Sequence, residues 1–429
     1  MKTKEKWFVI ITLFYIAYMV FPPLASMSGI PIWLICSAVS LSLIVMFPDC
    51  FRQRYFRWFF VYFSVLFLYL IVGHPFHING MGDSNDALWR LTIEIAWILP
   101  NLLICSVIMK LNDRKVNMWI GLGTMVLLAA SVLVILPMLF RYSRILRENT
   151  SGQLGGEELL ASLPGYTLMS SYIYIVPVFC YGIRRLNGVW KVLPAAFLAL
   201  FAYAIVKTEI TTSLVMLILL LLFTIVYQKE KGMTKTSFAF IIVSFALLVM
   251  YEMGVISLII KYLSSLYEGT AAESKFVDFH NMLEGKGKGN NLSVREYCRQ
   301  LSLACFYKDP LFGSPGVGGH SSLLDRLGSM GLFGFIPYLL MLIANVRAWY
   351  RFMPKRGAKF FYISGIIVVF IFLYMKGLFG GEGMLFMTVL LPISMIGVYE
   401  FSLSKNTIGK KVIVKKIAGD LSLSKKTLK

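Results

Sequence analysis

The sequence predicts an all-α polytopic membrane protein with about twelve transmembrane helices. Three observations predict this fold class. Of the 429 residues, 58% are hydrophobic and only 15% are charged, and the mean hydropathy is +0.72. Apolar runs of about 16 to 25 residues, long enough to cross a bilayer as a helix, recur along the chain. This composition excludes a disordered chain, a collagen and a small disulfide-rich secreted domain.

Six apolar runs lie in the first half of the chain and six in the second. In order they are 7–25, 30–47, 58–73, 91–109, 116–140, 166–183, 189–206, 210–227, 237–260, 327–344, 360–375 and 384–401. The first lacks a small-residue cleavage site, so it is interpreted as a retained span. The domains expected are nine spans in residues 1–260, a large extracytoplasmic loop at 261–326, three spans in 327–402 and a basic cytoplasmic tail at 403–429.

The formal net charge of +20 follows the expected topology and does not indicate a nucleic-acid partner. If Met1 is cytoplasmic, about 28 of the 42 basic residues and about 6 of the 22 acidic residues fall on the cytoplasmic side. The two sides then carry about +22 and −2, which is the positive-inside pattern. Both termini are therefore expected in the cytoplasm, with membrane lipids of negative charge near the basic tail.

Charged residues are nearly absent from the middle of the predicted spans. An ion-coupled carrier keeps ionisable side chains deep in its spans, so charged chemistry is instead expected at the outer face. The charged residues of the spans fall near outer ends, within reach of water: Glu94, Lys207, Glu209 and Glu252.

Three arginines open the outer loop that follows the fifth span. Arg141, Arg144 and Arg147 are spaced by three and share one helix face. They either bind an anionic substrate or anchor the helix at lipid phosphates, and their spacing leaves both roles open.

A helix is expected late in the long outer loop. Ser293 and Glu296 form a capping-box pattern at its start, and Asp309-Pro310 closes it. One of its faces is expected to dock on the bundle through Tyr297, Leu301 and Ala304 or Cys305.

Arg295 and Arg299 share another face of this helix, with Ser302 next along it. Two guanidiniums one turn apart suit a diphosphate, because each planar fork can bind two phosphate oxygens. The alternative is a solvated surface on which the arginines pair with Glu296 or Asp309.

A glycine-rich segment, 311–325, follows that helix and contains His320. Ser322 and Asp325 form a capping pattern, so His320 is expected just before the amino end of the helix that continues into the tenth span. Backbone N–H groups at such an end can bind phosphate beside the imidazole. A purely structural histidine is the alternative. The loop residues expected to contact substrate are Gly318, Gly319 and Ser321.

These residues resemble a known signature. His320-Ser321, followed after nine residues by Gly331-Leu332-Phe333-Gly334, is similar to the motif of the O-antigen ligase and O-antigen polymerase superfamily. Asp309-Pro310-Leu311-Phe312-Gly313, and Arg295 about 25 residues before the histidine, extend the resemblance. The motif covers about residues 293–334, and the expected topology extends the likeness to most of the chain.

The resemblance implies a GT-C-like membrane glycosyltransferase that uses a lipid diphosphate as leaving group, inverts the anomeric centre and needs no cofactor or metal. By that resemblance Arg295 binds the diphosphate of an undecaprenyl-linked glycan and Arg299 assists. His320 positions or activates the acceptor hydroxyl, or contacts the diphosphate. Members often carry an arginine near the start of the eighth span, where this chain has Lys207 as a substitute.

The resemblance favours a polymerase of O-antigen, capsule or exopolysaccharide repeat units in the bacterial inner membrane, with a chain-length regulator as partner. An O-antigen ligase, which transfers the glycan to a lipid A core of lipopolysaccharide, shares donor, fold and signature and stays open. A flippase of the lipid-linked unit would spread ionisable residues through its spans. A non-catalytic scaffold would give His320 and Arg295 no role.

Overall fold

The computed structural model is helical wherever regular structure is described. It describes residues 1–21, 23–24, 31–74, 87–141, 168, 171–208, 211–226, 255–269, 273–283, 290–354, 356–375 and 381–405. Seven helices in these ranges are long and apolar enough to cross a membrane, and none of the elements formed there is a β-strand. The all-helical fold class is therefore confirmed, and the helices are those of a membrane protein.

Helices of the first half occupy the positions of the first five apolar runs. They are α1 (Thr3–Val20), α3 (Ile32–Met46), α4 (Arg54–Ile71), α5 (Ala87–Leu111) and α6 (Arg114–Arg141), with the 3-10 turn η1 (Pro48–Arg52) before α4. The sixth to eighth runs correspond to η2 (Tyr172–Ile175), α10 (Val176–Arg185), η3 (Gly188–Lys191), α11 (Val192–Lys207) and α12 (Thr211–Val226).

The ninth run, 237–260, lies largely outside the described residues, and its last residues belong to a helix that continues to Leu266. Three helices precede the tenth span: α14 (Val255–Leu266), α15 (Glu273–Leu283) and α16 (Asn290–Lys308). The last spans are formed by α17 (Ser322–Phe352), by α18 (Arg356–Met375), and by α19 (Gly381–Leu385) continued by the π-helical turn η4 (Phe386–Leu390) and a helix at 391–405.

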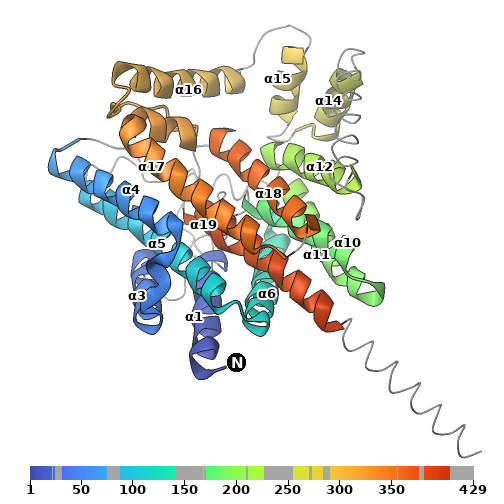
Figure 1. Cartoon of the computed structure of the whole chain (residues 1–429). Helices are drawn as coiled ribbons and strands as arrows, with labels where there is room; N and C mark the ends of the chain where they lie inside the picture. The colour runs from blue at the N-terminus through green and yellow to red at the C-terminus, as the bar shows by residue number, and fades with distance from the viewer. Residues whose placement is uncertain are drawn as a thin grey trace, which may run out of the picture.

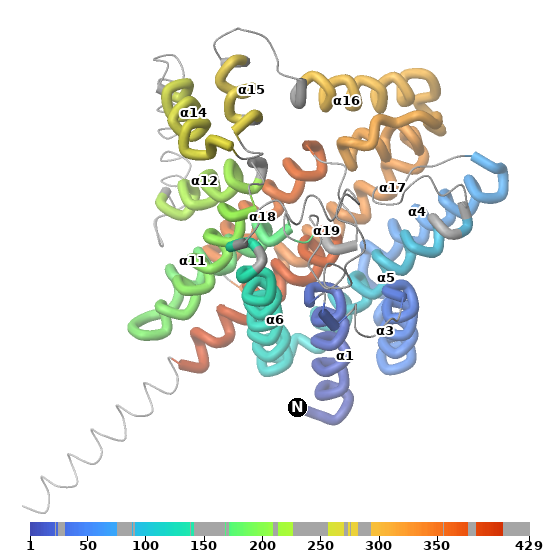
Figure 2. Tube along the Cα trace, turned by 180° about the vertical axis from the view of Figure 1, so that it is seen from behind, coloured from blue at the N-terminus to red at the C-terminus, as the bar shows by residue number. Residues whose placement is uncertain are grey.

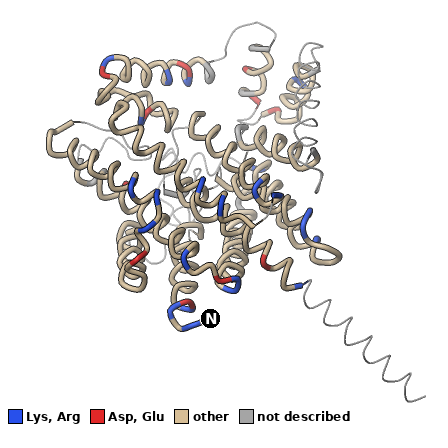
Figure 3. Tube along the Cα trace, in the orientation of Figure 1, with Lys and Arg blue, Asp and Glu red and all other residues tan. Residues whose placement is uncertain are grey.

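The two ends of the bundle differ. Met1 and the end of the 391–405 helix lie at one end, whereas α14, α15 and α16 lie at the other (Figures 1 and 2). Helix α16 lies across its end, above the start of α17 (Figure 1). Many lysines and arginines lie toward the end that contains Met1 (Figure 3).

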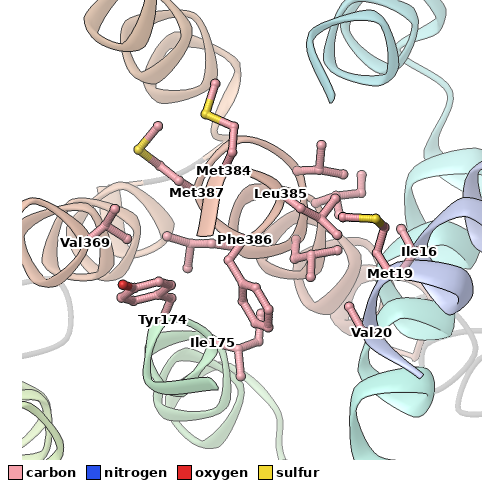
Figure 4. Packing of buried hydrophobic residues seen from close by; sticks show 14 of the residues in the cluster. Ile16, Met19, Val20, Tyr174, Ile175, Val369, Met384, Leu385, Phe386 and Met387 are labelled. Carbon is pink, nitrogen blue, oxygen red and sulfur yellow. The ribbon is translucent and has the colours of Figure 1, made fainter. Parts of the chain in front are cut away.

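The interior is packed tightly around the last span. Figure 4 shows buried side chains of α1, η2, α18 and the segment 384–387 pointing toward one another, among them Ile16, Met19, Tyr174, Val369 and Phe386. Gly121 of α6 faces Gly397, where an added Cβ would lie 2.5 Å from the carbonyl oxygen of Ile393. Such small residues let membrane helices approach closely.

Candidate active site at one end of the bundle

Helix α16 docks on the bundle through Ser302 and Cys305, and of these two residues only Cys305 belongs to the face that the sequence predicts. Tyr297, expected to be buried, is 61% exposed, whereas Ser302 is fully buried. The Cys305 thiol donates to the carbonyl oxygen of Pro315 at 3.2 Å, and an added Cβ at Gly328 would lie 2.4 Å from the carbonyl oxygen of Ser302. Small polar side chains therefore form the contact, because they allow the backbones to approach.

The start of α16 was also predicted wrongly, and its end correctly. The helix begins at Asn290, so Ser293 lies in its first turn and does not cap it. It ends at Lys308, before Asp309-Pro310. Asp309 then forms a turn, because its Oδ1 accepts the N–H groups of Leu311 at 3.2 Å and Phe312 at 3.1 Å.

The loop after α16 pairs with a break in α17. Gly331 has a φ of +56°, which interrupts the helix and frees the next N–H groups. The N–H of Leu332 donates to the carbonyl oxygen of Pro310, and that of Phe333 to the carbonyl oxygen of Leu311, both at 2.9 Å. The two glycine-containing parts of the sequence motif, near 310 and near 331, are thus hydrogen-bonded to each other.

Asp325 is fully buried, and both of its carboxylate oxygens accept hydrogen bonds. Oδ1 accepts from the Ser302 hydroxyl at 2.5 Å and from the Gly319 N–H at 3.3 Å, and Oδ2 accepts from the Ser321 N–H at 2.9 Å. The Ser302 oxygen in turn accepts the Gly318 N–H at 3.0 Å. The loop N–H groups expected to contact phosphate therefore donate to the protein's own acceptors, and substrate binding by these residues stays a prediction.

His320 lies immediately before the N-cap of α17, as the sequence predicts. The cap itself is Ser321, one residue earlier than expected, and its hydroxyl accepts the N–H of Leu324 at 3.3 Å. The shift places Asp325 a full turn beyond the cap, where its carboxylate reaches back to the Ser321 N–H.

Three charged residues act on the exposed His320. Partial desolvation lowers the pKa of His320 below its ordinary value of 6.5, and the positive charges of Arg295 and Arg299 lower it further. The negative charge of Asp325 opposes them. Both arginines of α16 therefore lie close enough to His320 for their charges to lower its pKa, which favours the neutral imidazole.

Arg299 also lines an open apolar groove along α18. Its guanidinium lies over the ring of Tyr374, 5.2 Å from the centroid, and its Nε has no hydrogen-bond partner in the part of the chain that the structure describes. The groove has a volume of about 630 Å³, and apart from Arg299 it is lined by Ile366, Ile367, Phe370, Ile371, Tyr374 and Met375.

The buried ion pair between Arg326 and Glu94 was not predicted from the sequence. Arg326 donates to Glu94 at 2.6 and 3.2 Å and to the Tyr62 hydroxyl at 2.7 Å, and it lies 4.3 Å from the ring centroid of Tyr338. Glu94, expected within reach of water, is only 2% exposed. The signal in the sequence was one charge of each sign near the outer ends of two apolar runs, which favours pairing within the membrane.

The remaining predicted residues are Lys207 and the arginines that follow the fifth span. Lys207 ends α11, lies 5.9 Å from the ring centroid of Tyr203, and is not among the charges that shift the His320 pKa. Arg141 ends α6, but its side chain is outside the described residues, as are Arg144 and Arg147.

Comparison with known proteins adds no assignment to this geometry. A scan against models of protein families finds no match, and a search of the curated proteins finds none either. The arrangement itself can hold an anion between two guanidiniums, accept a proton at a neutral imidazole, and keep an apolar chain beside Arg299.

Proposed function

We propose that this chain is a membrane glycosyltransferase that polymerises undecaprenyl-diphosphate-linked oligosaccharide repeat units at the outer face of the bacterial cytoplasmic membrane. The observation that carries the proposal is the position of Arg299, which lines an apolar groove and also acts on His320. A substrate that fits both the apolar groove and the cationic side chain has an apolar chain and an anionic head.

The groove and the arginines divide the donor between them. The isoprenoid chain lies along the aliphatic and aromatic wall of α18, which removes its apolar surface from water or replaces lipid contacts. The diphosphate binds the guanidiniums of Arg295 and Arg299, whose planar forks match phosphate oxygens. The guanidinium of Arg299 lies beside this wall, 5.2 Å from the ring centroid of Tyr374.

His320 completes the reaction. The acceptor is a sugar hydroxyl of a second lipid-linked unit, and the neutral imidazole accepts its proton. The hydroxyl oxygen bonds to the anomeric carbon with inversion as the bond from that carbon to the diphosphate oxygen breaks, and undecaprenyl diphosphate leaves with the electron pair. The arginines balance the charge that develops on the leaving group, so the proposed reaction uses no metal.

The proposed topology has about twelve crossings in a GT-C-like arrangement, with both termini cytoplasmic. Its support is that Met1 and the end of the helix at 391–405 lie at the end of the bundle opposite α16 (Figure 1). A chain-length regulator is the partner proposed for the outer face.

The test is the glycan-length profile of a host that lacks the gene and carries variants of the chain. We expect His320→Ala and Arg295→Ala to leave the protein in the membrane and to abolish long polymer, with single repeat units still reaching the surface. Lys308→Ala, an exposed cation on the same helix, is the matched control and should retain the full ladder.

Two outcomes would contradict the proposal. Normal polymer from both variants, at equal protein level, would contradict the assignment of His320 and Arg295 to the active site. Full-length polymer that remains on undecaprenyl diphosphate in the deletion host would show that the chain is a ligase and not a polymerase.

A further inference from the structure

One buried carboxylate joins the two segments that carry the candidate site. Asp325 binds the loop through the N–H groups of Gly319 and Ser321, and it binds α16 through the Ser302 hydroxyl. Without those bonds, a buried carboxylate would bear a large desolvation cost, so the folded state strongly favours the loop and α16 in this arrangement.

Ser302 makes the connection rigid because its hydroxyl is used twice. It donates to Asp325 and accepts the Gly318 N–H. The backbones are in close contact here, since an added Cβ at Gly318 would lie 2.1 Å from the carbonyl oxygen of Cys298. His320 is thus flanked on both sides by residues fixed to α16 or to α17, and α16 carries Arg295 and Arg299.

We propose that Asp325, acting through Ser302, is a positioning residue that holds His320 in register with the arginines of α16. Its relevance to catalysis rests on the proposed function. Asp325 does not contact substrate in this proposal, because the carboxylate is fully buried and is surrounded by protein donors.

The charges that face His320 come from two elements. Arg295 and Arg299 of α16 lower its pKa, and Asp325 of α17 raises it. Removal of the carboxylate charge therefore moves the pKa of His320 further down, whereas removal of the Ser302 hydroxyl leaves all three charges in place. A variant at each position separates charge from geometry.

The first measurement is made on the full-length protein in membranes and needs no substrate. In Asp325→Asn, we expect the amide hydrogens of Gly319 and Ser321 to exchange about fivefold to tenfold faster than in the wild type. Each of these N–H groups loses either its acceptor or the negative charge of that acceptor. The substitution should also move the pH profile of His320 modification by diethyl pyrocarbonate to lower pH. Ser302→Ala, which removes no charge, should accelerate exchange at Gly318 without shifting that profile to lower pH, and Ser302→Thr, which keeps a hydroxyl, should retain protection.

The second measurement is the transfer rate with the lipid-linked donor. A displaced base costs turnover more than binding, so we expect kcat to fall about 10- to 100-fold in Asp325→Asn while KM changes less than about threefold.

The results distinguish this inference from the proposed function. Wild-type exchange and an unmoved His320 profile in Asp325→Asn would overturn the positioning role, even if His320→Ala were inactive. Faster exchange with unchanged transfer would show that Asp325 holds the loop without positioning His320 for catalysis. That result would also overturn the inference, and the role of His320 would still be decided by His320→Ala.

Discussion

Glu94 and Arg326 show how far a residue's surroundings can depart from its place in the sequence. Each carries a charge in an apolar helix, and each is nearly inaccessible to solvent because it is paired with the other. Removing one partner leaves the other charge buried without compensation, which costs far more than the pair contributes to stability.

We therefore expect Glu94→Gln to lower the free energy of unfolding by about 3–5 kcal/mol. The exposed pair of Lys110 and Asp49, 3.2 Å apart, is the control, and Lys110→Met should cost about 0–1 kcal/mol. Thermal inactivation of the detergent-solubilised variants measures both. The double variant Glu94→Leu with Arg326→Met should be more stable than Glu94→Gln, and the reverse order would contradict this account.

The pKa of His320 gives a pH dependence of known sign. Arg295→Gln removes one of the two positive charges that lower this pKa, so the pKa should rise toward its ordinary value. The acid limb of His320 modification by diethyl pyrocarbonate should then move to higher pH. A shift to lower pH would contradict the electrostatic argument.

Residue-level prediction from sequence succeeded where the relation was local. Spacing along one helix predicted that Arg295 and Arg299 share a face, and capping chemistry predicted that His320 precedes a helix. The contact of Ser302 with Asp325 joins residues 23 apart in sequence, and that of Arg326 with Glu94 joins residues 232 apart. Neither pairing has a local signal, because each depends on how separate helices meet.

At the scale of elements, the break in α17 is built from its partner loop. An added Cβ at Gly331 would lie 2.4 Å from the carbonyl carbon and oxygen of Leu311, and the positive φ itself disfavours a side chain. We expect Gly331→Ala to lower the free energy of unfolding by more than about 2 kcal/mol. Gly188→Ala is the control, with a φ of +57° and open space around the added atom, and it should cost about 1 kcal/mol. Equal losses of thermal stability would show that the loop can move aside.

Apolar runs located the helices well because twenty residues without charge have few other uses. They could not determine which face of α16 docks. Tyr297 and Leu301 suggested an apolar interface, but the surface below α16 presents Asp325 and glycine backbone, which bind a small hydroxyl better. The capping pattern at Ser293 failed for a related reason, since α16 continues to Asn290 regardless of that local signal.

For the whole molecule, the sequence predicted helical spans more reliably than their number. Helix α3 has 15 residues and a length of about 22 Å, which is shorter than a hydrocarbon core of about 30 Å. Such short helices do not cross a bilayer by length alone, and periodic hydrophobicity does not distinguish a short span from a buried helix. Seven long spans are therefore clear in the described residues, and the remaining crossings belong to the proposed topology.

That topology can be tested by placing cysteines at the two ends of the bundle, in a chain whose half-buried Cys298 is replaced by serine. Tyr307→Cys, at a side chain that is 72% exposed on α16, should react with a membrane-impermeant maleimide added to intact spheroplasts. Lys4→Cys should react only after the membrane is permeabilised. Labelling of both positions in intact spheroplasts would remove the support for the proposed orientation. Labelling of Lys4→Cys alone would reverse that orientation.

The ion pair between α5 and α17 also constrains how the chain is made. Glu94 is synthesised 232 residues before Arg326, so its carboxylate lacks the guanidinium of Arg326 until α17 has been made. Arg326 lies near the start of α17 and makes it costly for that helix to enter lipid alone. Insertion of α17 therefore becomes favourable once α4 and α5 are present to receive it, and the contacts of Arg326 with Tyr62 and Glu94 form only then. The pairing of Glu94 with Arg326 therefore joins helices whose synthesis is separated by 232 residues, and a chain that stops before Arg326 leaves Glu94 without its cation.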